Sequence, residues 1–304
     1  MKKAGSNLVL YGALLANFGI AVAKFVAAAI TGSSAMLTEG FHSVVDSFNE
    51  VLLLYGKRRA AKPADAEHPF GYGRELYFWS LIVALLIFSV GAGFSIYEGV
   101  QHVRHPEPLR DPLVNYVVLA VALALEGASW RLAMRSVRAA KGTATWGDFL
   151  RGVRNPPDII VLLEDSAALL GICIAAVGVG LSQLTGNPRW DGVASIGIGA
   201  VLAVVAVLLA TLSKNLLIGE RPDPKMEADI RAEVLAQPGV VGINHLRAIH
   251  TGADQVFVAM SVDFDDDMTV GTLERRLTEV RHRLVARWPS ISNLYIRPES
   301  AFGE

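Results

Sequence analysis

Cysteine is almost absent from this sequence, because only Cys173 occurs among the 304 residues. A single thiol cannot form a disulfide within the chain, and a zinc cluster built from several cysteines is excluded. Cys173 lies in an apolar stretch, so we interpret it as a small packing residue.

The sequence also lacks a surplus of either charge, since it contains 28 Lys and Arg residues and 29 Asp and Glu residues. This balance implies no strong attraction to nucleic acid. The chain has no glycine-rich phosphate loop followed by lysine, which argues against ATP as an energy source. It has no Ser/His/Asp hydrolase signature either, and we expect that it is not an enzyme.

Long apolar stretches are abundant. Hydrophobic residues make up 52% of the chain, and the mean hydropathy is +0.39, which is typical of a multi-pass membrane protein. A helix needs roughly 20 apolar residues to cross the lipid bilayer. We therefore predict six transmembrane helices within residues 1–214, at about 7–30, 35–55, 77–100, 112–136, 158–182 and 190–213.

Basic residues flank these stretches unequally. One side carries only Arg104, Arg110 and Arg189. The side of the N-terminus has many more, namely Lys2, Lys3, Lys57, Arg58, Arg59, Lys62, Arg74, Arg131, Arg135, Arg138, Lys141, Arg151 and Arg154. Because cytoplasmic loops are enriched in Lys and Arg, we predict that both termini are cytoplasmic.

The composition changes near residue 215, where charges become frequent. Alternating apolar residues over 256–264 indicate a half-buried strand, and leucines and a valine over 273–284 have helical spacing. With a helix at 226–236 and strands at 240–248 and 294–296, the order is helix–strand–strand–helix–strand. We predict that residues 215–304 form a small cytoplasmic α+β domain of the ferredoxin-like type, with its helices on one sheet face.

Two of the apolar stretches carry ionisable residues. His42 and Asp46 are four residues apart and share one helix face, and Asp165 lies in the fifth stretch. Ionisable groups at membrane depth are costly and usually mark an ion path or a proton relay. Imidazole and carboxylate groups suit a divalent metal such as zinc. We predict that these three residues form a transported-ion site.

Other polar residues flank this trio. Glu164 points about 100° away from Asp165, and we expect it to act as a ligand or a proton carrier. Asn49 and Glu50 follow on the second helix, either as further ligands and relays or as helix–helix hydrogen-bond partners.

Two more spans contain polar residues with open roles. Glu126 suits a proton relay and a structural partner equally well. We interpret Asn17 and Lys24 as structural, with the lysine either reaching toward the membrane interface or pairing with an acid. In the second loop, His68 suits either a metal site or a solvated loop.

Several motifs together resemble the cation diffusion facilitator family and, within it, the zinc transporter nine-like branch. The resemblance covers nearly the whole chain. It implies a homodimeric antiporter in the lipid membrane that exchanges cytosolic zinc for protons, with cobalt, nickel, manganese or iron as other possible cargo. The motifs are Thr38-Glu39-Gly40-Phe41-His42-Ser43, His68-Pro69-Phe70-Gly71-Tyr72-Gly73-Arg74-Glu75, Tyr97-Glu98-Gly99, His105-Pro106-Glu107-Pro108 and Leu162-Leu163-Glu164-Asp165-Ser166-Ala167-Ala168.

The resemblance assigns ligand positions residue by residue. His42 and Asp46 occupy the paired ligand positions of the second helix, and Asp165 occupies the second position of the fifth. Val161 stands at the first position of the fifth helix, where the family often has His or Asp. Three protein ligands remain, with water, Glu164 or Asn49 to complete the shell.

Other family positions differ too. His68 matches a loop metal site, but Tyr72 stands where a histidine is common. In the tail, Asn244, Ser261 and Arg297 stand where zinc-regulated members often have histidines. We predict that the tail lacks the usual dinuclear zinc site and dimerises without metal.

Two other classes of function fit the same residues. A non-transporting membrane metal sensor or scaffold would bind metal without moving it. An intramembrane metalloenzyme, with an open-sided zinc at the predicted trio, would turn over a lipid or a peptide.

Overall fold

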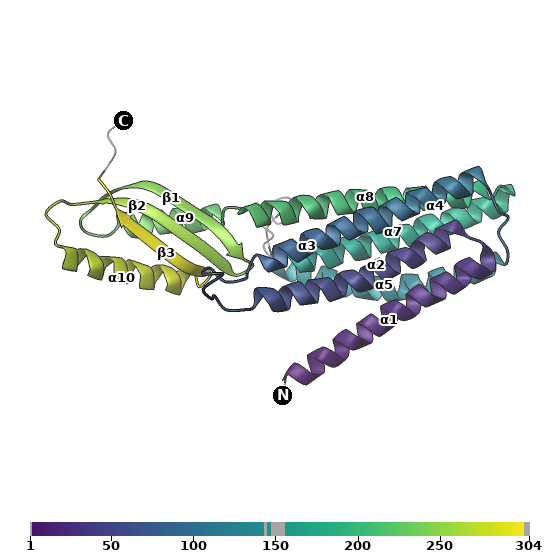
Figure 1. Ribbon diagram of the computed structural model, residues 1–304, viewed down its shortest axis with the longest axis horizontal. Helices are drawn as coiled ribbons and strands as arrows, with labels where there is room; N and C mark the ends of the chain where they lie inside the picture. The colour runs from purple at the N-terminus through teal and green to yellow at the C-terminus, as the bar shows by residue number, and fades with distance from the viewer. Residues whose placement is uncertain (1, 143–144, 147–155, 301–304) are drawn as a thin grey trace. The chain divides into compact units, whose positions relative to one another are not determined.

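A computed structural model describes residues 2–142, 145–146 and 156–300 (Figure 1). The chain divides into two compact units. The helical unit comprises Met1–Arg58, Phe78–Trp146 and Asn155–Lys214, and the tail unit comprises Arg59–Tyr77, Gly147–Arg154 and Asn215–Glu304. Arg151 and Arg154, counted above with the basic residues, lie outside the described residues.

The helical unit consists of long helices at the predicted positions. They are α1 (Lys2–Thr31), α2 (Ser34–Ala60), α3 (Glu75–Leu86), α4 (Gly93–Arg104), α5 (Pro112–Lys141), α7 (Pro156–Thr185) and α8 (Arg189–Ile218). A π-helical segment, Ile87–Ala92, joins α3 and α4 into one continuous helix.

Four helices among the described residues are long and apolar enough to cross a membrane. They are Glu75–Arg104, Pro112–Lys141, Ile159–Thr185 and Arg189–Ile218. The described apolar part of α1, Asn17–Thr31, is shorter. Helix α2 is long but carries Glu39, His42 and Asp46 along its length, which lowers its apolar character. The prediction of six apolar spans is therefore confirmed for four helices.

Small residues allow the helices of this unit to approach closely. Gly99 of α4 faces Gly192 of α8, and a Cβ atom on Gly99 would lie 2.6 Å from the Gly192 carbonyl oxygen. Gly199, two helical turns further along α8, faces α4 in the same way, because its Cβ would lie 2.7 Å from Ile96. Close contacts through glycine are typical of helix pairs in membranes.

The outer surface of the helical unit is apolar. Large hydrophobic side chains are exposed on several helices, including Phe18, Leu132, Val177 and Val204. A soluble protein seldom exposes so many of these side chains together, whereas lipid accommodates them. The exposed residues thus agree with a multi-pass membrane protein.

The tail unit has the predicted order of elements. It contains α9 (Pro224–Leu235), β1 (Val240–Gly252), β2 (Gln255–Phe264), α10 (Val270–Arg287) and β3 (Ile291–Pro298). The sheet order is β1-β2-β3, with β1 antiparallel and β3 parallel to β2. The parallel pairing requires a crossover connection, which α10 provides.

Alternate side chains of β2 form the core of the tail unit. Val256, Val258, Met260 and Val262 point to one sheet face, where buried residues of α9 and α10 pack against them. Both helices therefore cover the same face, as the sequence predicted.

The loop after α2 belongs to the tail unit in the structure. The Phe70 ring contacts the Phe257 ring edge to face, with centroids 5.4 Å apart. Gly73 lies against the end of β1, where a Cβ atom would come within 2.5 Å of the Thr251 carbonyl oxygen. This close approach requires glycine, because backbone atoms of β1 occupy the space.

Candidate functional site

A small cavity of about 10 Å³ lies among α1, α2, α5 and α7 in the helical unit. That is about the smallest volume that holds one water molecule, so a fully hydrated ion would not fit. Carboxylates dominate its wall, which is formed by Asn17, Ser43, Asp46, Glu50, Glu126, Val161, Glu164 and Asp165.

Helix α2 places an imidazole beside this cavity. His42 Nδ1 lies 3.3 Å from Asp46 Oδ1, because residues four apart meet on one helix face. The His42 side chain is buried, with 1% exposure, and neither ring nitrogen has a hydrogen-bond partner within the described ranges. A buried imidazole with a carboxylate beside it and no hydrogen bond on either nitrogen is available to bind a cation or a proton.

Asp165 of α7 reaches the same cavity as Asp46 and is oriented by α5. Its Oδ2 atom accepts a hydrogen bond from the Ser129 hydroxyl at 2.8 Å. The structure therefore brings the predicted carboxylates of α2 and α7 to one cavity, with His42 adjoining it.

Glu164 also lines the cavity, although it points away from Asp165 along α7. Glu164 and Asp165 leave α7 in different directions, and both side chains reach the cavity wall. Glu164 Oε1 accepts a hydrogen bond from Asn49 Nδ2 at 2.6 Å. Glu50 Oε1 accepts one from Asn17 Nδ2 at 3.0 Å. These amides tie two of the carboxylates to neighbouring helices.

The described residues include no group of three or more His, Cys, Asp or Glu side chains close enough to hold a metal ion. The predicted ligands thus surround a common space without converging on one point. Rotation of the carboxylates would be needed for them to bind an ion together.

Lys24 of α1 forms a buried ion pair next to this region. Its Nζ atom lies 2.9 Å from Glu39 Oε2 and donates a hydrogen bond to Ser43 Oγ at 2.8 Å. Lys24 and Glu39 are both completely buried. Of the two roles considered for Lys24, pairing with an acid is the one that the structure contains.

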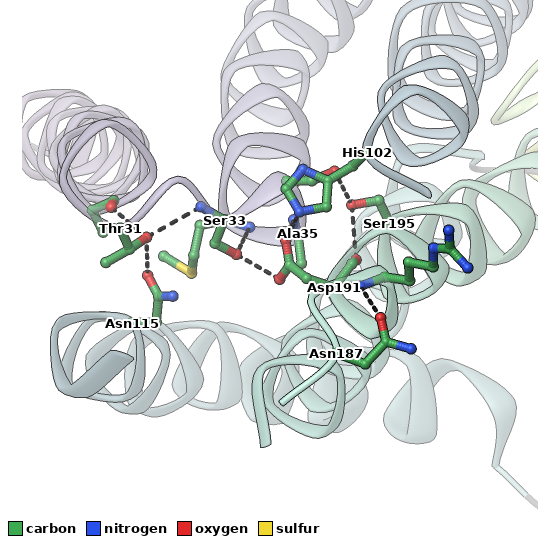
Figure 2. Close-up of polar contacts among 12 residues, drawn as sticks. Thr31, Ser33, Ala35, His102, Asn115, Asn187, Asp191 and Ser195 are labelled. Atoms are coloured by element: carbon green, nitrogen blue, oxygen red, sulfur yellow. Dashed lines mark hydrogen bonds and ion pairs between the residues drawn. The ribbon is translucent and has the colours of Figure 1, made fainter. Parts of the chain in front are cut away.

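A second polar cluster joins the turn between α1 and α2 to α8 (Figure 2). Asp191 accepts hydrogen bonds from the Ser33 hydroxyl at 2.7 Å and from the Ala35 amide at 3.2 Å. His102 Nε2 of α4 lies 3.8 Å from Asp191 Oδ2. Sequence reasoning missed this cluster; the available signal was a carboxylate in the first turn of a very apolar helix.

At the predicted loop site, His68 and Tyr72 both contact Asp65. Tyr72 donates a hydrogen bond to Asp65 at 2.7 Å, and His68 Nδ1 lies 3.6 Å from the other Asp65 oxygen. The Tyr72 hydrogen bond, with help from backbone amides, lowers the pKa of Asp65, and the same bond raises the pKa of Tyr72. A metal at His68 would therefore compete with Tyr72 for Asp65.

Three tail residues, Asn244, Ser261 and Arg297, converge on Glu299; they are the ones that we predicted to stand at histidine positions. Asn244 donates to Ser261 Oγ at 3.3 Å and to the Glu299 carbonyl at 2.9 Å. Ser261 and Arg297 both donate to the Glu299 carboxylate. The Arg297 hydrogen bond, followed by that of Ser261, lowers the pKa of Glu299 to about 2.

Residues 10–218 match the profile of the cation efflux transmembrane domain. The chain belongs to the cation efflux family, the cation diffusion facilitators. Residues 222–301 of this cation efflux protein match the profile of the family's cytoplasmic domain, which is named for dimerisation. Members of the family are cation transporters and not enzymes.

Named relatives agree with this assignment. The "Proton-coupled zinc antiporter SLC30A9, mitochondrial" of Mus musculus is 36% identical over 245 residues, which cover 80% of this chain and 43% of that protein. "Metal tolerance protein C4" of Arabidopsis thaliana is 32% identical over 87% of this chain and 58% of its own length. "Cation-efflux pump FieF" of Cronobacter sakazakii is 27% identical over 93% of this chain and 89% of its own.

This cation efflux protein spans less than half the length of the SLC30A9 proteins that it matches, of which the mouse and human sequences show the same 43% coverage. The family assignment rests on the matched domains.

Proposed function

We propose that this cation efflux protein is an antiporter that exports a divalent transition metal from the cytosol in exchange for protons. Zinc is the principal cargo, and cobalt, nickel, manganese and iron are the alternatives to test. The observation that carries the proposal is the ion-sized cavity lined by carboxylates beside the His42–Asp46 pair. The printed name of the SLC30A9 relative, a proton-coupled zinc antiporter, supports the same function.

His42, Asp46 and Asp165 are the proposed protein ligands. Glu164, Asn49 or water completes the shell, and Glu50 serves as a proton relay near the Asn17 amide. Carboxylate and imidazole ligands must lose their protons before they bind a metal, so metal binding releases protons. Protons that enter from the opposite side then compete for the same groups and displace the metal.

Histidine suits this exchange because its charge changes near neutral pH, unlike that of any other unperturbed side chain. A site that opens alternately to the two sides of the membrane converts this competition into transport. The cavity is too small for a fully hydrated ion, so we expect the metal to lose most of its water molecules when it binds.

The proposed architecture follows the distribution of charge and apolar surface. All six long helix positions within residues 1–214 span the membrane, α1 and α2 included, and both termini face the cytoplasm. The polar residues of α2 are tolerated because they face the cavity and Lys24 instead of lipid. Residues 215–304 form the cytoplasmic domain that joins two copies into a homodimer.

The test is flux in proteoliposomes across a panel of divalent metals, with and without a pH gradient. Wild-type protein is expected to take up zinc and to release protons in a fixed ratio. Asp46→Ala and Asp165→Ala should abolish both fluxes, whereas Glu107→Ala, at an exposed residue, should leave them unchanged. Normal transport by both site variants would contradict the proposed site. Zinc binding by wild-type protein without any flux would favour a non-transporting sensor instead.

A further inference from the structure

We infer that Glu126 of α5 supplies a ligand to the transported metal, in place of the one that Val161 of α7 cannot provide. The inference rests on the proposed transport function. It adds a third helix to a site otherwise built from α2 and α7.

Glu126 lies at the cavity, on a helix that packs against α7. Glu126 is buried, with 8% exposure, and lines the same cavity as Asp46 and Asp165. Helix α5 packs along α7, and residues one turn beyond Glu126 contact α7 directly. Ser129 donates to Asp165 at 2.8 Å, and Trp130 Nε1 donates to Ser166 at 3.0 Å.

The spacing of residues along α5 explains why Glu126 points toward α7 and the cavity. Residues three and four positions apart lie on one face of a helix, so Glu126, Ser129 and Trp130 share the face that meets α7. The carboxylate of Glu126 is therefore directed to the cavity by the same packing that orients Asp165.

The wall of the cavity lacks a donor at one place. Val161 precedes Asp165 by one helical turn and contributes only methyl groups to a cavity otherwise lined by polar atoms. A tetrahedral metal needs four ligands, and His42, Asp46 and Asp165 supply three. The missing ligand must come from another side chain of the wall or from water.

Glu126 differs from the other candidates in its freedom to rotate. Glu164 is held by the Asn49 amide, and Glu50 by the Asn17 amide. Glu126 has no hydrogen-bond partner and no ion pair in the part of the chain that the structure describes, and it does not pair with Arg131. Glu126 can therefore turn toward an ion without breaking a hydrogen bond, whereas Glu164 and Glu50 cannot.

His42 is a second, independent sign that a cation belongs here. Its ring is almost fully buried and both nitrogens lack hydrogen-bond partners among the described residues. Buried polar groups normally have hydrogen-bond partners. The His42 imidazole has only the Asp46 carboxylate nearby and no hydrogen bond, which indicates that a ligand completes its contacts.

The experiment compares zinc affinity and zinc flux in four full-length proteins: wild type, Glu126→Ala, Glu126→Gln and the double variant Glu126→Ala/Val161→Asp. Removing a residue that only hydrogen-bonds to a metal ligand lowers metal affinity roughly 10- to 100-fold. Because we infer that Glu126 is itself a ligand, Glu126→Ala should lose at least that much zinc affinity. Glu126→Gln keeps an oxygen donor without the charge and should fall in between. The double variant should regain most of the lost affinity, because its new carboxylate lies on the same cavity wall.

Controls separate this inference from the proposed function. Glu107→Ala removes an acid outside the cavity and should bind and transport zinc as wild type does. If wild type moves no metal, the transport proposal fails. If wild type transports and Glu126→Ala keeps wild-type zinc affinity, with or without flux, the ligand role of Glu126 is wrong. Should the alanine variant not fold, unchanged affinity in folded Glu126→Gln would overturn it as well.

Discussion

Two kinds of surroundings distinguish Glu39 from the carboxylates of the cavity in the helical unit. Glu39 is neutralised by the Lys24 ammonium, whereas Asp46, Glu126 and Asp165 face the cavity. An isolated charge is too costly to bury, so the first kind needs its counter-ion for folding. The second kind keeps its binding capacity for an ion or for protons.

Replacing Lys24 with methionine should therefore destabilise the protein strongly. Glu39 would remain buried without its counter-ion, and removing one partner of a buried pair costs about 3–5 kcal/mol. Thermal unfolding in detergent measures the loss. The double variant Lys24→Met/Glu39→Gln should recover most of it, because no uncompensated charge is left. Equal stability of Lys24→Met and wild type would show that the pair does not matter for folding.

Glu299 makes the stability of the tail unit depend on pH. Arg297 and Ser261 lower its pKa to about 2 in the folded protein, from an ordinary value of 4.5. The carboxylate thus contributes its full stabilisation above pH 4.5 and loses it as the pH falls toward about 2.

The measurement is the melting temperature of wild type and Glu299→Gln across this pH range. Above pH 4.5, wild type should melt at a higher temperature than Glu299→Gln. The melting temperatures of the two proteins should converge as the pH falls toward about 2. A difference that does not change with pH would mean that the charge of Glu299 is unimportant.

Among the helices, Asp191 connects α8 to the start of α2. It satisfies the Ser33 hydroxyl and the Ala35 amide at the turn between α1 and α2. Asp191 itself is completely buried. Because α2 carries His42 and Asp46, this contact fixes the end of the helix that positions the candidate site.

Asp191→Ala should destabilise the protein by about 1–3 kcal/mol for each buried donor that is left unpaired. Asp191→Asn retains a carbonyl oxygen and should lose less. Unfolding of both variants in detergent provides the comparison, with Arg189→Ala as a control at an exposed position in the first turn of the same helix, α8. The prediction is wrong if the alanine and asparagine variants are equally stable.

For the assembled protein, we propose that the tail unit joins the two copies and that this association needs no metal. Asn244, Ser261 and Arg297 bind Glu299 instead of presenting histidines. We therefore expect the homodimer to persist when metal is removed. Size-exclusion chromatography with light scattering, before and after treatment with a chelator, tests this directly. Dissociation to monomers in the chelator would indicate that metal holds the two copies together.

The order of helices and strands follows from the sequence, because hydrophobic periodicity and length are local properties. The pairing of His42 with Asp46 was predictable for the same reason, since it needs only the pitch of one helix. Period-two alternation likewise identified β2 and the face that it buries.

Which side chains meet across helices depended on the folded structure. Glu126, Lys24 and Asp191 each lie in apolar surroundings in the sequence, yet one lines the cavity, one pairs with Glu39 and one caps a turn. The rotation and axial shift of one helix against another result from packing of the full set of side chains, including the close glycine contacts of α4 and α8. No single stretch of sequence encodes those offsets, and they determine where the carboxylates gather.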